Sequence, residues 1–250
     1  MTIILGMYYD HQKGGLIASD SRAEIDLVSY DLIRKIELQD GLVLSIAGDS
    51  YKGDELLENI IPTLREISKD DPERSKKIRT VIKEKQRELE KEYKSTKKKG
   101  EDEEDDVGVF GFYTTHPEIF CLTEKGNVGA ITSGFETAGL VPNGARGLLK
   151  AFYHPDISRE QAMVLAAYVI VNSSNNYHQI DDNPQMALIE KDGIKILNSY
   201  GENFLFKTPE IEELKMRSRE ILLGQKKVFD VLSGSSEESK SKLVRMLGEF

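Results

Sequence analysis

TIILGMYY (residues 2–9) and GLIASDSR (residues 15–22) give the strongest indication of how this chain folds. Both are rich in β-branched, aliphatic or aromatic residues, which favour strands. The polar segment 10–14 between them reads as a turn, so the pair predicts a β-hairpin that begins at residue 2. IRKIEL (33–38) and GLVLSIAG (41–48) predict a second hairpin around the turn Gln39–Asp40–Gly41.

Helical periodicity follows these hairpins. Apolar residues at helical spacing predict a helix over 54–68, which Pro62 should kink or interrupt. Asp71–Pro72 is a cap and first-turn pair that should start a second helix with a thin apolar stripe. KKKGEDEEDD (97–106) is a charged loop. Residues 54–106 are therefore expected to form an extended, charged helical hairpin.

The rest of the chain alternates runs of strands with pairs of helices. Strands are expected at 107–115, 118–126, 127–134, 185–193 and 194–199, and helices at 144–153 and 158–171. Ser158 to Gln161 is a capping box that should open the second of these helices. Thr208–Pro209 should start a C-terminal helix that Gly224 ends, with a short helix at 236–247.

This order of elements predicts an α+β fold. Helices grouped between runs of antiparallel strands favour two sheets with helical layers outside them. We expect one domain over 1–207 and a helical extension over 208–250.

Composition excludes several classes of protein. The 250 residues carry a net charge of −9, which disfavours nonspecific DNA binding. No apolar run approaches the length of a membrane span, and the N-terminus lacks the layout of a signal peptide. Cys121 is the single cysteine, so no internal disulfide can form and a reducing, cytoplasmic compartment is expected.

Thr2 is the residue around which catalysis could be built. A hydroxyl needs a base to become a nucleophile, and an α-amine titrates near neutral pH. If Met1 is removed, residue 2 supplies both groups. Asp20 ends the strand paired with the Thr2 strand, and Lys35 lies in the next hairpin. A lysine near Thr2 would lower the pKa of its hydroxyl and amine, and a carboxylate would hold that lysine charged.

The order of these motifs resembles the start of proteasome β-type subunits, within the N-terminal-nucleophile (threonine) hydrolases. That family shows an initial Thr-strand, then Asp-Ser-Arg, Arg-Lys-Ile and Ala-Gly. This chain has Thr2, ASDSR (18–22), IRKI (33–36) and SIAGD (45–49) in the same order. TSGFETAGL (132–140) resembles the family's Gly-Ser-Gly loop that leads into a helix. The resemblance implies a divergent member with a four-layer αββα sandwich.

The resemblance also implies roles for individual residues. Thr2 would be nucleophile and base, with Asp20 and Lys35 as its activating charge pair. The Gly48 N–H would stabilise the oxyanion, and Ser133 would bond the Thr2 amine. Supporting roles would fall to Arg22 in the turn and to Asn172 and Ser173. Asn172 would replace the family's Asp. Asp181 and Asp182, further along the chain, would substitute for that Asp only if their loop folds back.

The same resemblance implies that a substrate peptide adds as a strand beside Thr2. The residues expected to shape its first pocket are Ala23, Glu24, Ile33, Glu37, Ile46, Ser50 and Asp54. The acidic side chains at 37 or 54 would favour a basic residue before the cleaved bond.

Three functions remain open from the sequence. The first is a threonine endopeptidase in a homo-oligomeric ring or stack, acting on peptides or unfolded proteins without nucleic acid or membrane partners. The second is a Thr2-dependent transpeptidase or amide ligase. The third is an inactive scaffold. Against it, this chain starts at the predicted strand, whereas the family's inactive α-type subunits carry a helical extension before that strand. The scattered histidines have no metal-ligand spacing, so neither metal nor cofactor is expected. Cys121, in mid-strand, is interpreted as a buried structural residue.

Overall fold

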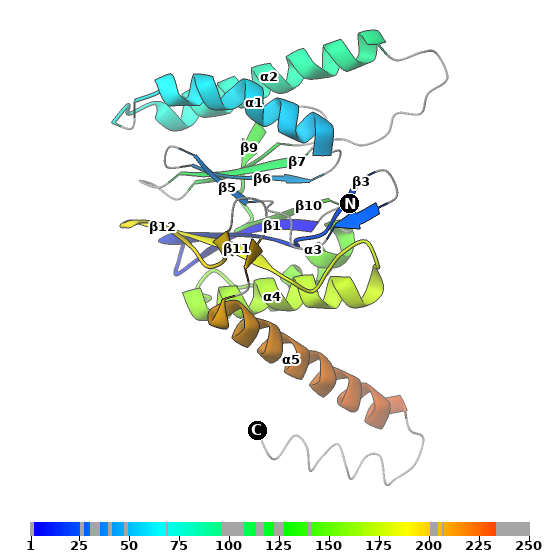
Figure 1. Ribbon diagram of the computed structural model, residues 1–250. Helices are drawn as coiled ribbons and strands as arrows, with labels where there is room; N and C mark the ends of the chain where they lie inside the picture. Colours follow the sequence, from blue (N-terminus) through cyan, green and yellow to red (C-terminus); the bar gives the residue numbers. More distant parts are fainter. Residues whose placement is uncertain are drawn as a thin grey trace.

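The computed structural model describes residues 3–25, 28–30, 36–39, 42–47, 50–68, 70–96, 108–113, 118–122, 128–139, 142–200, 205–206 and 208–233. Within these ranges, two five-stranded antiparallel sheets are stacked and helices cover the outer face of each (Figure 1). This arrangement confirms the predicted four-layer αββα sandwich.

The first sheet has the order β10-β1-β2-β11-β12. Its strands are β1 (Ile3–Tyr9), β2 (Gly14–Ser19), β10 (Phe135–Gly139), β11 (Gln185–Glu190) and β12 (Gly193–Ile196). The hairpin of β1 and β2 confirms the prediction from the opening sequence, with Ile4 opposite Ser19. Strand β10 was not predicted, because its sequence reads as a loop. It pairs with β1 and places Gly139 opposite Ile3.

The second sheet is a meander of consecutive strands in the order β5-β6-β7-β8-β9. Its strands are β5 (Ile36–Gln39), β6 (Leu42–Ala47), β7 (Gly108–Tyr113), β8 (Ile119–Leu122) and β9 (Val128–Ala130). Two short hairpins lie outside the main sheets and were not predicted. They consist of β3 (Ala23–Ile25) with β4 (Val28–Tyr30), and β13 (Ser199–Tyr200) with β14 (Leu205–Phe206).

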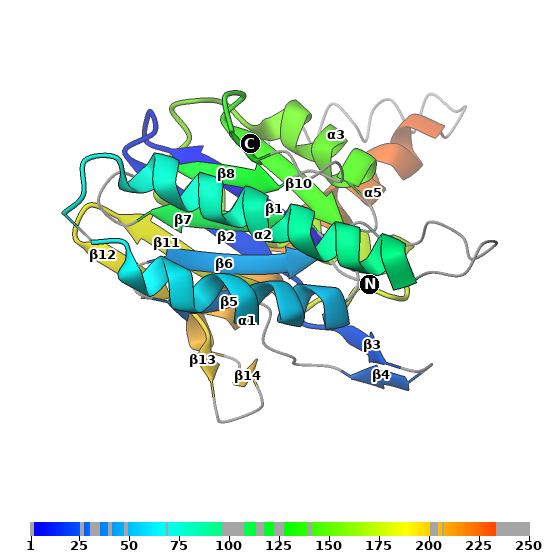
Figure 2. The ribbon, with the colours of Figure 1, turned by 90° about the horizontal axis from the view of Figure 1, so that it is seen from above.

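Helices α1 (Ser50–Glu66) and α2 (Arg74–Thr96) run side by side over the second sheet (Figure 2). The predicted apolar stripe packs there, and Leu56, Ile60 and Ile78 are buried against Leu44. The charged helical hairpin is therefore an outer layer of the sandwich. Pro62 lies inside α1 without ending it. The charged loop at 97–106 lies outside the described residues.

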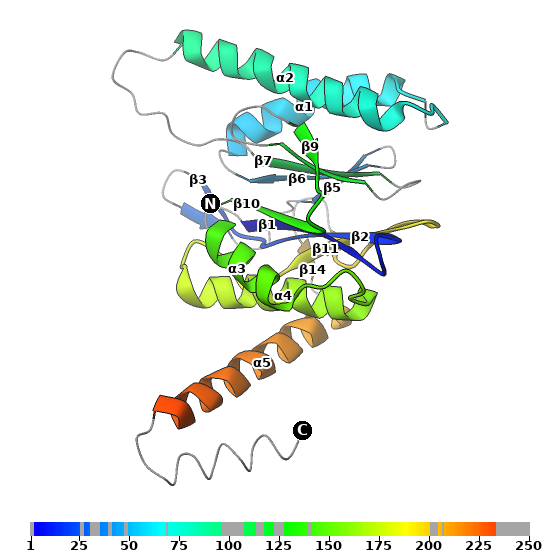
Figure 3. The ribbon, with the colours of Figure 1, turned by 180° about the vertical axis from the view of Figure 1, so that it is seen from behind.

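Helices α3 (Pro142–Phe152) and α4 (Arg159–Asn176) cover the first sheet (Figure 3). The predicted capping box opens α4, with the Ser158 hydroxyl accepting the Gln161 N–H. Helix α5 (Pro209–Ser233) packs against α4. The prediction that Gly224 ends this helix is wrong. A helical glycine costs only about 1 kcal/mol, and good helix formers follow it. The predicted helix at 236–247 lies outside the described residues.

Three apolar clusters hold the four layers together. Strand β1 is buried on both faces, so its successive side chains enter different clusters. Ile3, Leu5 and Met7 pack toward α3 and α4, whereas Ile4 and Tyr8 pack between the two sheets. Double burial explains why IILGMYY is almost continuously apolar.

Candidate active site

A fully buried carboxylate lies where β1 begins. Asp20 directly follows β2, and its side chain is 0% exposed. Its Oδ1 accepts the backbone N–H of Ile3 at 2.9 Å, and its Oδ2 accepts the N–H of Arg22 at 3.1 Å. Charge-assisted bonds of this kind are stronger than neutral ones. Asp20 therefore fixes the backbone immediately after residue 2 to the turn that follows β2.

The turn is held in place by a loop distant in sequence. Asp181, 5% exposed, lies between α4 and β11. Its Oδ1 accepts the Ser21 N–H at 2.8 Å, and its Oδ2 accepts the Ser21 hydroxyl at 2.6 Å. The Arg22 guanidinium donates to the His178 carbonyl in the same loop. The 177–184 loop thus folds back onto the segment that contains Asp20.

Ser21 was not predicted as a site residue, and Asp181 was given a role only on the condition that its loop folds back. Asp181 belongs to the run Asp181-Asp182-Asn183, a dense polar signal before a buried strand. The contact between Asp181 and Ser21 spans 160 residues, so no local pattern could establish it. The carboxylate beside the turn comes from Asp181 and not from position 172.

Asn172 and Ser173 are placed in helix α4. The Ser173 hydroxyl is buried and donates to the Val169 carbonyl at 2.7 Å, and the Asn172 carbonyl accepts from the Asn176 side chain. These described bonds are all made within the helix. The expected substitution of Asn172 for a site aspartate therefore has no support in this geometry.

The structure does not bring Ser133 to the start of β1. Strand β10 runs antiparallel to β1, with Phe135 opposite Met7, and the Gly134 carbonyl accepts the Tyr8 N–H. Ser133 therefore lies by the far end of β1, about 20 Å from Ile3 at about 3.3 Å per residue. The error came from reading TSGFETAG as a loop, although residues 135–139 form a strand.

Gly139 occupies the place that Ser133 was expected to take. It ends β10 opposite Ile3 and has φ of 103°, a conformation that glycine adopts without strain. Its position makes it the neighbour of Ile3, the first residue of β1.

Other predicted site residues cannot be placed in full. Thr2, Lys35, Gly48 and Ile33 lie outside the described residues. For the remaining pocket residues the backbone is described: Ala23 and Glu24 lie in β3, Glu37 in β5, Ile46 in β6, and Ser50 and Asp54 in α1.

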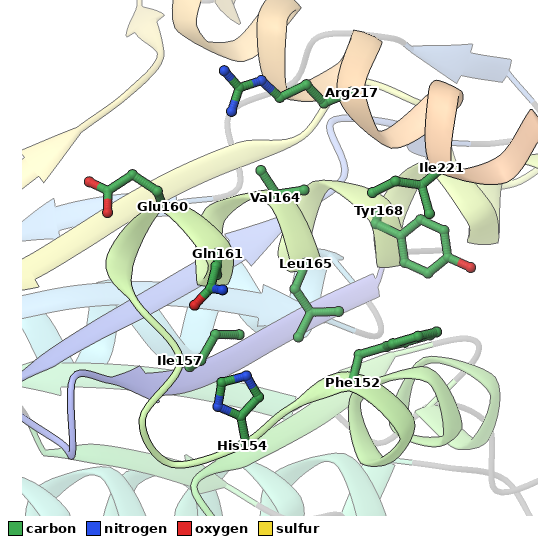
Figure 4. Close-up of a pocket in the computed structure, with 10 residues that line it drawn as sticks. All are labelled: Phe152, His154, Ile157, Glu160, Gln161, Val164, Leu165, Tyr168, Arg217 and Ile221. Carbon is green, nitrogen blue, oxygen red and sulfur yellow. The ribbon is translucent and has the colours of Figure 1, made fainter. Parts of the chain in front are cut away.

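A cavity of about 330 Å³ lies elsewhere, between α4, α5 and the connection from α3 (Figure 4). Phe152, Leu165 and Tyr168 give it apolar walls, with Glu160 and Arg217 at its margin. None of its lining residues belongs to the Asp20 turn, so it is not the candidate active site.

The described ranges contain neither a candidate metal site nor a candidate membrane span. No group of three or more His, Cys, Asp and Glu side chains there could hold a metal ion. No helix there is both long and apolar enough to cross a membrane.

Comparison with known proteins supports the fold. No family model and no curated protein matches the chain. Among solved structures, Anbu (ancestral beta-subunit) from Yersinia bercovieri has a TM-score of 0.69 at 16% identity, over 94% of this chain and 99% of that one. An Anbu (Gly-1) mutant from Hyphomicrobium sp. strain MC1 has a TM-score of 0.65 at 15% identity, over 90% and 96%.

These likenesses show a proteasome-like, N-terminal-nucleophile hydrolase fold. They also correct the assignment to the proteasome β-type subunits as a family. The motif order suggested membership, but no family model matches, and identities of 15–16% to Anbu carry the fold alone. The short motifs at 18–22, 33–36 and 45–49 are therefore compatible with this fold without establishing that family.

Proposed function

We propose that this chain is a threonine peptidase whose nucleophile is Thr2, exposed by removal of Met1. One observation carries the proposal: the buried Asp20 carboxylate holds the Ile3 N–H, the first peptide group after residue 2. A residue that is both nucleophile and base needs its backbone fixed, because its hydroxyl oxygen must reach the carbonyl carbon while its amine takes the hydroxyl proton. Asp20 supplies that constraint.

The proposed chemistry has two steps. The Thr2 amine takes the hydroxyl proton while the oxygen attacks the peptide carbonyl, and the proton then passes to the leaving amine. Water, deprotonated by the same amine, hydrolyses the resulting ester. The Lys35 ammonium would favour the alkoxide, and the Gly48 N–H would stabilise the tetrahedral oxyanion.

Several features of the proposal are still predictions. These are the peptide substrate, the homo-oligomeric ring or stack and the cytoplasmic location. The predicted first pocket, which would be formed by residues of β3, β5, β6 and α1 together with Ile33, is expected to favour a basic residue before the cleaved bond. Cleavage of Arg-ended peptides faster than Leu-ended ones would support this pocket, and a clear preference for Leu would contradict it.

Hydrolysis of fluorogenic peptides by purified protein tests the function. Intact mass should show that Met1 is absent, and Thr2→Ala should abolish turnover while Thr132→Ala, an exposed loop threonine, retains it. Lys35→Ala should leave the fold intact and remove turnover, whereas Lys150→Ala on the exposed side of α3 should not. Equal rates for Thr2→Ala and the wild type would overturn the proposal.

A further inference from the structure

Helix α5 reaches the candidate active site through a buried lysine. Lys215 is 5% exposed, although lysine is almost never buried unless it is paired. Its Nζ lies 2.6 Å from Asp182 Oδ1 and donates to Asn183 Oδ1 at 2.9 Å. Both partners belong to the 177–184 loop. The Lys215 ammonium therefore binds the loop and not solvent.

The Asn183 side chain links Lys215 to Asp181. Its Oδ1 faces the Lys215 ammonium, and its Nδ2 donates to Asp181 Oδ2 at 3.2 Å. The Asn183 N–H also donates to Asp181 Oδ1, at 3.3 Å. Asp181 in turn accepts from Ser21. A continuous chain of hydrogen bonds thus joins α5 to the turn that contains Asp20.

Charge makes this arrangement stable. Burial raises the pKa of Asp182, but hydrogen bonds and charge from Lys215 and Arg219 outweigh it, so its pKa lies below the usual value of 3.8. Asp182 is therefore ionised at neutral pH and binds two cations of α5. The pairing offsets the cost of burying the Lys215 ammonium.

We propose that Lys215 is a positioning residue, which holds the Asp20 turn in its active geometry through Asn183, Asp181 and Ser21. The proposal rests on the peptidase function for its effect on turnover, but the structural coupling stands independently of it. Activity would then depend on the docking of α5 against α4, although α5 contributes no group to the reaction.

Amide hydrogen exchange measured by NMR tests the coupling without any substrate. The Ser21 N–H is bonded to Asp181, so its exchange reports directly on that contact. In Lys215→Met, which keeps the length of the side chain, the Ser21 and Arg22 amides should exchange at least about tenfold faster, while amides in the middle of β2 change far less. Arg217→Met, in the same helix with an exposed ion pair to Glu213, should leave both amides unchanged. Unchanged exchange at Ser21 in Lys215→Met would overturn the proposal.

Kinetics test the consequence for catalysis. Lys215→Met should lower kcat about tenfold with KM within about twofold, and Lys215→Arg should restore part of the loss. In a Ser21→Ala background the Lys215→Met change should have a smaller effect, because one of the two bonds between Ser21 and Asp181 is already lost. Additive effects would contradict this route. If the wild type cleaves no peptide, the peptidase proposal fails, but the exchange experiment still decides the coupling.

Discussion

Replacing Asp20 with Asn isolates the contribution of the buried carboxylate. The substitution keeps volume and one acceptor, but it turns the second oxygen into an NH2 group facing a backbone N–H donor. An ionised acceptor contributes about 1.5–3 kcal/mol, and a buried donor left without a partner costs about 1–3 kcal/mol. Because Asp20 is completely buried, water cannot compensate. We expect the free energy of unfolding to fall by about 2–4 kcal/mol.

Thermal unfolding followed by circular dichroism measures this change. A loss of that size corresponds to a decrease in Tm of about 5–15 °C for a chain of this length. Asp156→Asn is the matched control, since its side chain is 65% exposed and its partner His154 is also exposed. The control should leave Tm unchanged. If Asp20→Asn has the same Tm as the control, the bonds to Ile3 and Arg22 do not fix the start of β1.

Three further predictions concern other parts of the fold. Gly14→Ala would place Cβ 2.2 Å from the buried Tyr9 ring, so urea unfolding should show a loss of about 1–3 kcal/mol, whereas Gly147→Ala, with open space in a helix, should gain up to about 1 kcal/mol. Burial raises the pKa of Cys121 to about 12, so at pH 8 its thiolate should be about a thousandfold scarcer than that of an ordinary thiol. An aromatic disulfide reagent should therefore label Cys121 slowly in the folded protein and quickly in urea, and equal labelling rates would contradict this. The lowered pKa of Asp182 stabilises the folded state above pH 3.8, so the stability difference between wild type and Asp182→Asn should be largest near neutral pH and shrink as pH falls below that value; a constant difference would refute it.

Local patterns predicted most of the fold because they report on burial. The apolar run of β1, the stripe of α1 and the capping box of α4 each follow from side chains that must leave water or satisfy a helix end. Strand β10 was missed because Gly134, Thr137 and Gly139 resemble turn residues, although residues 135–139 pair with β1 as a strand. Helix α5 continues past Gly224 because the residues that follow it favour a helix.

The candidate site was harder to predict because it is assembled from distant segments. Asp20 was identified from the hairpin and its position after β2. Ser21 and Asp181 meet only when the loop after α4 folds back, and Lys215 joins them from a helix still further along. Residue types indicated that these side chains are polar, but only tertiary structure gives their partners.

Reaction with a peptide epoxyketone, followed by mass spectrometry of the labelled N-terminal peptide, tests whether Thr2 is the nucleophile. The reagent forms its adduct through two covalent bonds, one to an amine and one to a hydroxyl, only where one residue carries both groups. We expect the adduct on Thr2 in a protein that lacks Met1, its loss in Thr2→Ala and its retention in Thr132→Ala. An active protein that keeps Met1, or an adduct on any other residue, would rule out Thr2 as the nucleophile.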